Sequence, residues 1–523
     1  MNRTHVIVST LLVVSSGLVG CGGGEDAVVP AQVARPVASV APPPSDTTPD
    51  APFRAYPPNP EGALAVNAPD VVERKLSNGI RVLFVSRQTL PLFAIRVGVL
   101  SGAVDDATVP PVVATATGQL LEMGTKKFTA EAYSEAFDAI GGRHSASLGW
   151  TGGALAAEGP VEALDRILDL VGSATLEPTF PEEEVKRLKE RWRGQNEIKK
   201  TSASWLAWNS LGRVVAGEKH PLAHPSAGRP EELDKLSRGA IDAFYKRTFV
   251  AENVGIAVCG ALNPEELLPK LEARFGKLKK GTAPRKVLPL EAPQKKVVFV
   301  EKKGATQSQV MAAMGGTTLL TDENREATYV ADAIFGGMFS SRLNLNLREQ
   351  HAFTYGAHSS FFEHRAFSIL TAGGAIVREH TKEALDEMQK ELTRFAGGDI
   401  TDAELKDAKE YLRLAHVRGF ETVWDTVSEL GSILQEGKPA NEFRLRADKL
   451  EKVTLADVQR AAKARYLAAP PTIIVVGDRS VFTDQLDKLK GFGPIEERGA
   501  YGEFPKAVEK AEKKPPTEGA PKK

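Results

Sequence analysis

FYKRTFVAENVGIAVCG, residues 244–260, has a counterpart in AAKARYLAAPPTIIVVG, residues 461–477. In both stretches a helical segment ends on an aromatic residue, a short turn follows, and a strand rich in β-branched residues ends on glycine. Phe249 and Tyr466 are 217 positions apart, and so are Gly260 and Gly477. A repeat of this length that mixes strands and helices predicts two tandem homologous domains.

The beginnings of the two repeats also correspond. FAIRVGVLSGAVDD (93–106) and SQVMAAMGGTTLLTDEN (308–324) each run from a strand through a glycine turn into an acidic loop, and a helical segment follows. The Lys/Pro-rich residues 276–296 between the repeats are typical of a linker. We therefore expect an α+β fold in which each domain has a largely antiparallel sheet packed with helices, at residues 63–285 and 286–500.

One long segment, residues 401–435, has the apolar spacing of helices and predicts a helical layer of the second domain. Its aromatic residues Tyr411, Phe420 and Trp424 are expected in the core.

The N-terminus predicts export. Residues 1–20 combine Arg3 with an apolar run too short to cross a bilayer, which is typical of a signal peptide. The ending LVGC resembles a bacterial lipobox, which implies cleavage before Cys21 and its lipidation. The alternative is an ordinary secretory signal with a chance cysteine. Because Gly22 gives no cue for inner-membrane retention, we expect a lipid-anchored protein of the cell envelope, at the periplasmic face of the outer membrane.

The remaining composition narrows the function classes. The Pro-rich residues 21–62 predict a tether, and the Lys/Glu/Pro-rich residues 501–523 predict a disordered tail. With 67 basic and 67 acidic residues, the chain has no charge footprint for nucleic acid. Cys21 and Cys259 are its two cysteines, so lipidation of the first leaves no disulfide and no cysteine metal site.

Several motifs, in order along the chain, resemble the insulinase or pitrilysin family, and most closely its bacterial group similar to the mitochondrial processing peptidase. They are LSNGIRVLFV (76–85), HPLAHPSAGRPEEL (220–233), GATQSQV (304–310), GGMFSSRLNLNLREQHAFTYGAHSSF (336–361) and PTIIVVGD (471–478). The resemblance implies zinc-dependent peptide hydrolysis. In this family a helix of the first domain carries His-x-x-Glu-His, whose histidines bind zinc and whose glutamate activates a water, and a later helix adds a glutamate ligand.

This sequence departs from the family at that motif. Counting back from Gly124-Thr125, its five positions read Thr115, Ala116, Thr117, Gly118 and Gln119, and no histidine occurs between His5 and His144. The third ligand would fall near Gln195 or Asn196. His220 and His224 have a suitable separation but lie in a predicted loop with no acidic partner. We therefore expect no metal bound by this chain and zinc in a partner subunit.

The second domain retains a different pair. By resemblance, Arg348 and Tyr355 match the arginine and tyrosine that the metal-free partners of this family keep. A tyrosine hydroxyl can stabilise negative charge on a peptide carbonyl oxygen, and an arginine can hold substrate carbonyl or carboxylate groups. Gly336 and Gly337 are expected to form a substrate loop with close backbone approach. The alternative is an ion-paired arginine at a helix end and a half-buried tyrosine.

Two functions remain open. The chain is either the non-catalytic subunit of a heteromeric zinc metallopeptidase that acts on extended peptides with a zinc-motif-bearing homologue, or an envelope pseudoenzyme that binds peptides or serves as a scaffold. In either case we expect no hydrolysis by this chain alone.

Overall fold

The computed structural model describes residues 68–466 and 470–505. The predicted signal peptide, Cys21 and the tether lie outside the described residues. Within the part described, no helix is long and apolar enough to span a membrane.

The first sheet has six strands. Their order across the sheet is β1 (Val72–Lys75), β2 (Arg81–Ser86), β6 (Val254–Gly260), β3 (Leu92–Val99), β5 (Gly153–Pro160) and β4 (Arg143–Leu148). Strands β2 and β6 are parallel, and every other neighbouring pair is antiparallel.

The second sheet repeats this topology. Its order is β12 (Ile495–Arg498), β7 (Lys296–Glu301), β11 (Thr472–Gly477), β8 (Gln307–Gly316), β10 (Phe367–Val377) and β9 (Thr354–His364). Strand β7 is parallel to β11 and β12, and the remaining pairs are antiparallel. The strands β2, β6, β3, β5 and β4 therefore correspond to β7, β11, β8, β10 and β9. The predicted α+β fold with two homologous domains is confirmed.

The first half contains eight of the described α-helices. They are α1 (Pro111–Leu120), α2 (Ala130–Asp138), α3 (Leu164–Leu176), α4 (Glu182–Lys199), α5 (Ala203–Ala216), α6 (Pro230–Lys235), α7 (Arg238–Thr248) and α8 (Pro264–Phe275). Their starts follow local rules: the side-chain oxygens of Thr129 and Ser237 accept hydrogen bonds from the first turns of α2 and α7. Short helices connect them at η2 (Ala103–Asp105), η3 (Val161–Ala163), η4 (Pro221–Ala223) and η5 (Ala251–Asn253).

The second half begins its helices after β8. They are α9 (Arg325–Asp332), α10 (Arg342–Asn344), α11 (Thr381–Ala396), α12 (Asp402–Arg418), α13 (Val423–Glu436), α14 (Glu442–Lys452), α15 (Leu455–Tyr466) and α16 (Arg479–Leu489). Two π-helical turns, η6 (Ala333–Gly337) and η7 (Leu345–Gln350), continue α9 and α10. The short helices η8 (Arg378–His380) and η9 (Lys490–Phe492) complete the set.

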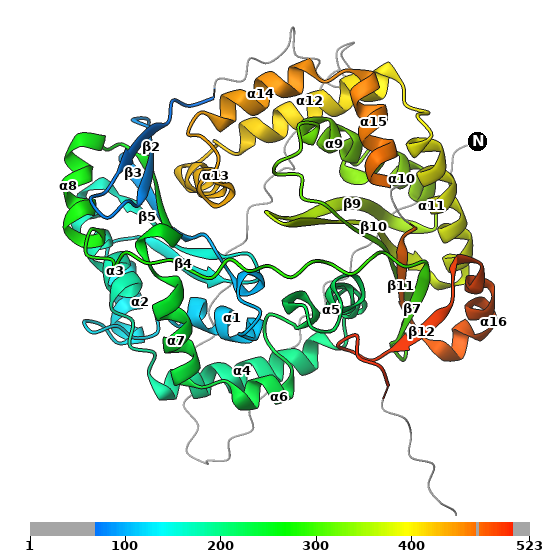
Figure 1. The fold of residues 1–523 in the computed structure, drawn as a ribbon, viewed down its shortest axis with the longest axis horizontal. Coiled ribbons are helices and arrows are strands. Elements are labelled where there is room, and N and C mark those ends of the chain that lie inside the picture. Colours follow the sequence, from blue (N-terminus) through cyan, green and yellow to red (C-terminus); the bar gives the residue numbers. More distant parts are fainter. Residues whose placement is uncertain (1–67, 467–469, 506–523) are drawn as a thin grey trace, which may run out of the picture. The chain divides into compact units, whose positions relative to one another are not determined.

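The two halves exchange one helix each. Helix α13 packs on β3 and β6 of the first sheet, whereas α5 packs on β8 and β11 of the second (Figure 1). Val427, Leu430 and Leu434 of α13 share a buried apolar cluster with Leu83 and Ala257. Each sheet is therefore covered on one face by a helix from the other half. The two expected domains, residues 63–285 and 286–500, thus each contribute one helix to the other's sheet.

The folded body extends past the expected start of the tail. Tyr501 is buried and its ring lies edge-on to that of Trp205. The tail boundary expected at residue 501 is therefore too early, because an aromatic residue near the C-terminus packs on α5.

Candidate functional site

Helix α1 carries residues 115–119, which the resemblance places at the zinc motif. Thr115 and Gln119 lie one turn apart and are half-buried. The Thr115 hydroxyl donates to the carbonyl oxygen of Pro111 within the same helix, at 3.2 Å. The amide oxygen of Gln119 accepts from the guanidinium of Arg191 on α4, at 3.0 Å. On this helix face, the Thr115 hydroxyl is thus hydrogen-bonded within α1 and the Gln119 amide is hydrogen-bonded to Arg191, where the family would have two metal ligands.

Gly118, at the position of the family's catalytic glutamate, is packed against strand β4. A Cβ atom placed on Gly118 would lie 2.2 Å from the backbone nitrogen of Leu148. Real side chains do not approach backbone so closely, so any larger residue requires α1 and β4 to separate. This junction leaves no space for a glutamate side chain.

Helix α4 does not supply a third ligand. Gln195 is exposed, and Asn196 is buried with its amide donating to the carbonyl oxygen of Gly228 at 2.9 Å. Glu197 is exposed and pairs with Lys200 at 2.7 Å. Among the described residues, no three His, Cys, Asp or Glu side chains are grouped so that they could hold a metal ion. The residues present at α1 and α4 do not fit the zinc that the resemblance implies.

The histidines of the HPLAH segment have structural partners. His220 is buried, and its Nδ1 accepts from the backbone nitrogen of Leu222 at 3.1 Å. His224 pairs through Nδ1 with Glu232 of α6. The expectation that this segment has no acidic partner is therefore wrong. Glu232, eight residues further along the chain, lies on α6 and contacts His224.

Arg348 and Tyr355 flank the turn between η7 and β9. The Tyr355 side chain is 91% exposed. The Arg348 guanidinium lies over the ring of Phe339, 4.6 Å from its centroid, and its Nη1 is 3.5 Å from Glu349 Oε1. Nη1 is shielded from solvent and makes no hydrogen bond with any described residue. The site therefore contains an exposed phenol hydroxyl and a guanidinium that is ion-paired with Glu349 but makes no hydrogen bond through Nη1.

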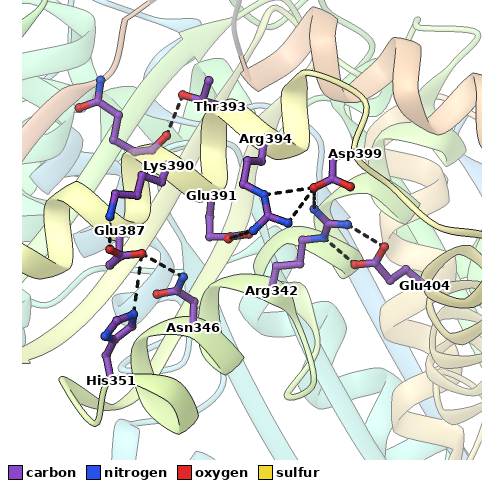
Figure 2. A network of polar contacts seen from close by, with 11 residues as sticks. Arg342, Asn346, His351, Glu387, Lys390, Glu391, Thr393, Arg394, Asp399 and Glu404 are labelled. Atoms are coloured by element: carbon purple, nitrogen blue, oxygen red, sulfur yellow. Dashed lines mark hydrogen bonds and ion pairs between the residues drawn. The ribbon is translucent and has the colours of Figure 1, made fainter.

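Polar contacts fix both ends of the helical segment 342–351, which includes Arg348 (Figure 2). At its start, Arg342 forms a two-pronged pair with Glu404, with Nη2 at 2.8 Å from Oε2. Glu404 also accepts from the backbone nitrogen of Thr401 and so caps α12. Burial alone would raise the pKa of Glu404, but the bonds from Arg342 and Thr401 hold it below its ordinary value.

The far end of the segment is fixed by Glu387 of α11. Its carboxylate accepts from the side-chain amide of Asn346 at 3.4 Å and lies 3.8 Å from His351 Nε2 (Figure 2). A hydrogen bond from Lys390 holds the pKa of Glu387 below its ordinary value. Arg348 therefore lies on a segment anchored to α11 and α12 rather than on a free loop, which limits the motion of its backbone.

Gly336 and Gly337 lie in the π-helical turn η6. Gly336 is buried, and a Cβ there would lie 2.5 Å from the backbone nitrogen of Ser359 on β9. The close backbone approach that the sequence suggested thus occurs, but to a strand of the same chain. Phe339 lies two residues beyond Gly337 and is exposed at 73%. Sequence reasoning did not select Phe339, although an aromatic residue beside a glycine pair and a candidate arginine was a usable signal.

Two protein-family models match the chain. The model for insulinase (peptidase family M16) matches residues 81–214, which include Thr115 to Gln119. The model for the peptidase M16 inactive domain matches residues 235–412, which include Arg348 and Tyr355. An uncharacterized zinc protease of Bacillus subtilis is 23% identical over 384 residues, covering 72% of this chain and 92% of the relative. One from Mycobacterium leprae is 24% identical over 378 residues, covering 72% and 84%.

Solved structures have the same fold. A peptidase M16 inactive domain from Pseudomonas fluorescens superposes with a TM-score of 0.73 at 24% identity, covering 78% of this chain and 98% of that chain. A protease from Helicobacter pylori superposes with a TM-score of 0.69 at 18% identity, covering 78% and 100%.

Proposed function

Because this chain is a homologue of the insulinase (M16) peptidases and has two domains of that family, we propose that it is the non-catalytic subunit of a heteromeric zinc metallopeptidase in the cell envelope. The observation that carries the proposal is a contrast between the two halves. On α1 the positions of the family's metal ligands hold Thr115 and Gln119, whereas η7 carries Arg348, whose Nη1 makes no hydrogen bond, and β9 carries the exposed Tyr355. The partner is a homologous chain with an intact His-x-x-Glu-His motif, and the substrates are extended peptides.

Each residue has a role that its chemistry supports. Zinc in the partner would supply activation of the attacking water. Tyr355 donates its hydroxyl to the peptide carbonyl oxygen as negative charge develops there. Arg348, whose segment is held by the Arg342 and Glu387 contacts, binds a substrate carbonyl or carboxylate through its guanidinium.

The test is peptide hydrolysis by the purified chain alone, by a zinc-motif homologue from the same genome alone, and by their mixture. We expect activity in the mixture well above the sum of the two. Tyr355→Phe should lower kcat of the mixture about 100-fold, the typical effect of losing one transition-state donor, and Arg348→Ala should raise KM as well. Arg418→Ala removes an exposed arginine at the end of α12 and serves as the matched control.

Two results would contradict the subunit proposal. Zinc-dependent hydrolysis by this chain alone would mean that α1 has been misread. Peptide binding without enhanced hydrolysis, unchanged by Arg348→Ala and Tyr355→Phe, would instead support the peptide-binding or scaffold pseudoenzyme.

The location is a separate part of the proposal. Lipidation at Cys21 would tether the body at the periplasmic face of the outer membrane. Incorporation of labelled palmitate that Cys21→Ser abolishes, together with recovery of the chain in outer-membrane fractions, supports this location; a freely released wild-type chain contradicts it.

A further inference from the structure

Two basic runs from distant parts of the first half meet at one cavity. Lys127 lies in the loop before α2, and Lys277 and Lys279 follow the end of α8. All three line a cavity of about 780 Å³ at the ends of α3, α7 and α8, which we call the basic groove. This volume is within the range of ligand-binding pockets.

The positive charge of the basic groove is not neutralised locally. Its two carboxylates are already paired, Asp169 with Arg274 at 2.9 Å and Glu177 with Lys126 at 3.4 Å. Lys127, Lys277 and Lys279 are exposed, and the structure gives none of them an ion pair within the described residues. The basic groove thus carries three uncompensated charges in a chain whose net charge is zero.

The floor of the basic groove is apolar. Leu176, half-buried at the end of α3, lines it together with Phe249 and Val250, which are exposed at 5% and 8%. The ring of Phe249 packs against that of Tyr245, with centroids 4.6 Å apart. Cations near helix C-termini complement the helix dipoles, which accounts for part of the charge. That effect does not require an open cavity with an apolar floor.

We propose that the basic groove binds an acidic peptide segment through an apolar side chain inserted between the lysines. The charge selects carboxylate-rich ligands, and the floor accepts one leucine- or phenylalanine-sized group. A flat anionic bilayer would contact the exposed lysines, but it would leave the almost fully buried Phe249 and Val250 without a ligand. The proposal is independent of the hydrolytic role, because neither Arg348 nor Tyr355 lines the basic groove.

The test uses a fluorescein-labelled 12-residue peptide with glutamates around one central phenylalanine, titrated with the full chain and followed by anisotropy. We expect saturable binding that weakens with added salt. The combined Lys127→Gln, Lys277→Gln and Lys279→Gln variant should bind about tenfold more weakly, as expected for three exposed charge contacts. Replacing the central phenylalanine with serine should also weaken binding.

Matched control variants distinguish peptide binding in the basic groove from nonspecific attraction of the acidic peptide to other surface lysines. The combined Lys186→Gln, Lys219→Gln and Lys235→Gln variant removes three exposed lysines elsewhere in the first half and should bind like the wild type. Arg418→Ala, which removes an exposed arginine of α12, should also bind like the wild type. Thermal unfolding checks that both lysine variants remain folded.

Three outcomes would overturn the proposal: absence of peptide binding, equal binding by the groove variant and the wild type, or capture of phosphatidylglycerol vesicles with no affinity for the peptide. The last would assign the lysines to a membrane surface.

Discussion

The junctions α1/β4 and η6/β9 occupy corresponding places in the two halves. In each, a helical glycine contacts the edge strand of its own sheet: Gly118 lies against Leu148 and Gly336 against Ser359. A Cβ at these glycines would lie 2.2 Å and 2.5 Å from the strand nitrogen. The glycine in the catalytic-glutamate position thus serves the packing role that its counterpart serves in the second half.

The difference between the junctions is in the polar groups beside them. In the first half Gln119 is bound by Arg191, so the helix face is closed by an internal contact. In the second half Nη1 of Arg348 makes no hydrogen bond and Tyr355 is 91% exposed. A duplicated framework can thus keep the same packing in both copies while the groups that could contact a ligand differ between them.

The strongest test of this comparison is Gly118→Glu. We expect a loss of about 4 kcal/mol in unfolding free energy, because the side chain overlaps β4 and carries a charge into a buried site. Urea unfolding measures it. Gly194→Glu, at an exposed position of α4 with open space around it, is the matched control and should be nearly neutral.

Adding Thr115→His and Gln119→His to Gly118→Glu tests whether the junction can open. We expect no stoichiometric zinc binding by calorimetry. A stable triple variant that binds one zinc per chain would show that α1 and β4 separate easily and that the closed junction is not an obstacle.

A smaller loss of unfolding free energy is expected when the ion pair that anchors the Arg348 segment is removed. Arg342→Ala removes a partly buried two-pronged pair with Glu404 and should lower the unfolding free energy by about 2 kcal/mol. Arg418→Ala, on an exposed position of α12, should change it little. Equal effects of the two variants would mean that the Arg342 contact does not anchor the segment.

The same pair predicts a pH dependence. Because the pKa of Glu404 is lowered in the folded state, its stabilisation is present above the ordinary value of 4.5 and is lost as pH falls through the lower folded value. The stability difference between the wild type and Arg342→Ala should therefore narrow below about pH 4.5, as measured by urea unfolding from pH 6 to pH 3. A difference that widens on acidification would contradict this assignment.

The smallest effect is expected for Tyr355→Phe. Its side chain is almost fully exposed, so the unfolding free energy should change by less than about 0.5 kcal/mol. Thermal unfolding provides the measurement. A clear loss of stability would mean that the Tyr355 hydroxyl stabilises the fold, and it would contradict the proposal that this hydroxyl contacts the substrate.

Local patterns were sufficient for the repeat and the sheets. The match of residues 244–260 to 461–477 corresponds to α7 with β6 and α15 with β11, because a helix and its following strand are set by short-range periodicity. The expectation that Tyr411 lies in the core is wrong, since it is 42% exposed on α12. Apolar spacing indicates a helix but does not say which positions a distant element covers.

Long-range placements were beyond the sequence. The pairing of Gln119 with Arg191, the anchoring of Asn346 by Glu387 and the exchange of α5 and α13 depend on how distant elements meet in space. The resemblance singled out Arg348 and Tyr355 in the sequence. The exposure of Tyr355 and the contacts of the Arg348 guanidinium could be known only from the structure.

The helix exchange has a consequence for biosynthesis. The first sheet is complete in sequence at Gly260, yet α13, which covers one of its faces, begins at Val423. As the chain emerges from N- to C-terminus, the face formed by residues such as Leu83 and Ala257 stays uncovered until most of the second half has been produced. The first half therefore cannot finish folding as an independent unit, and chaperone binding is expected to be strongest on chains interrupted between these two points.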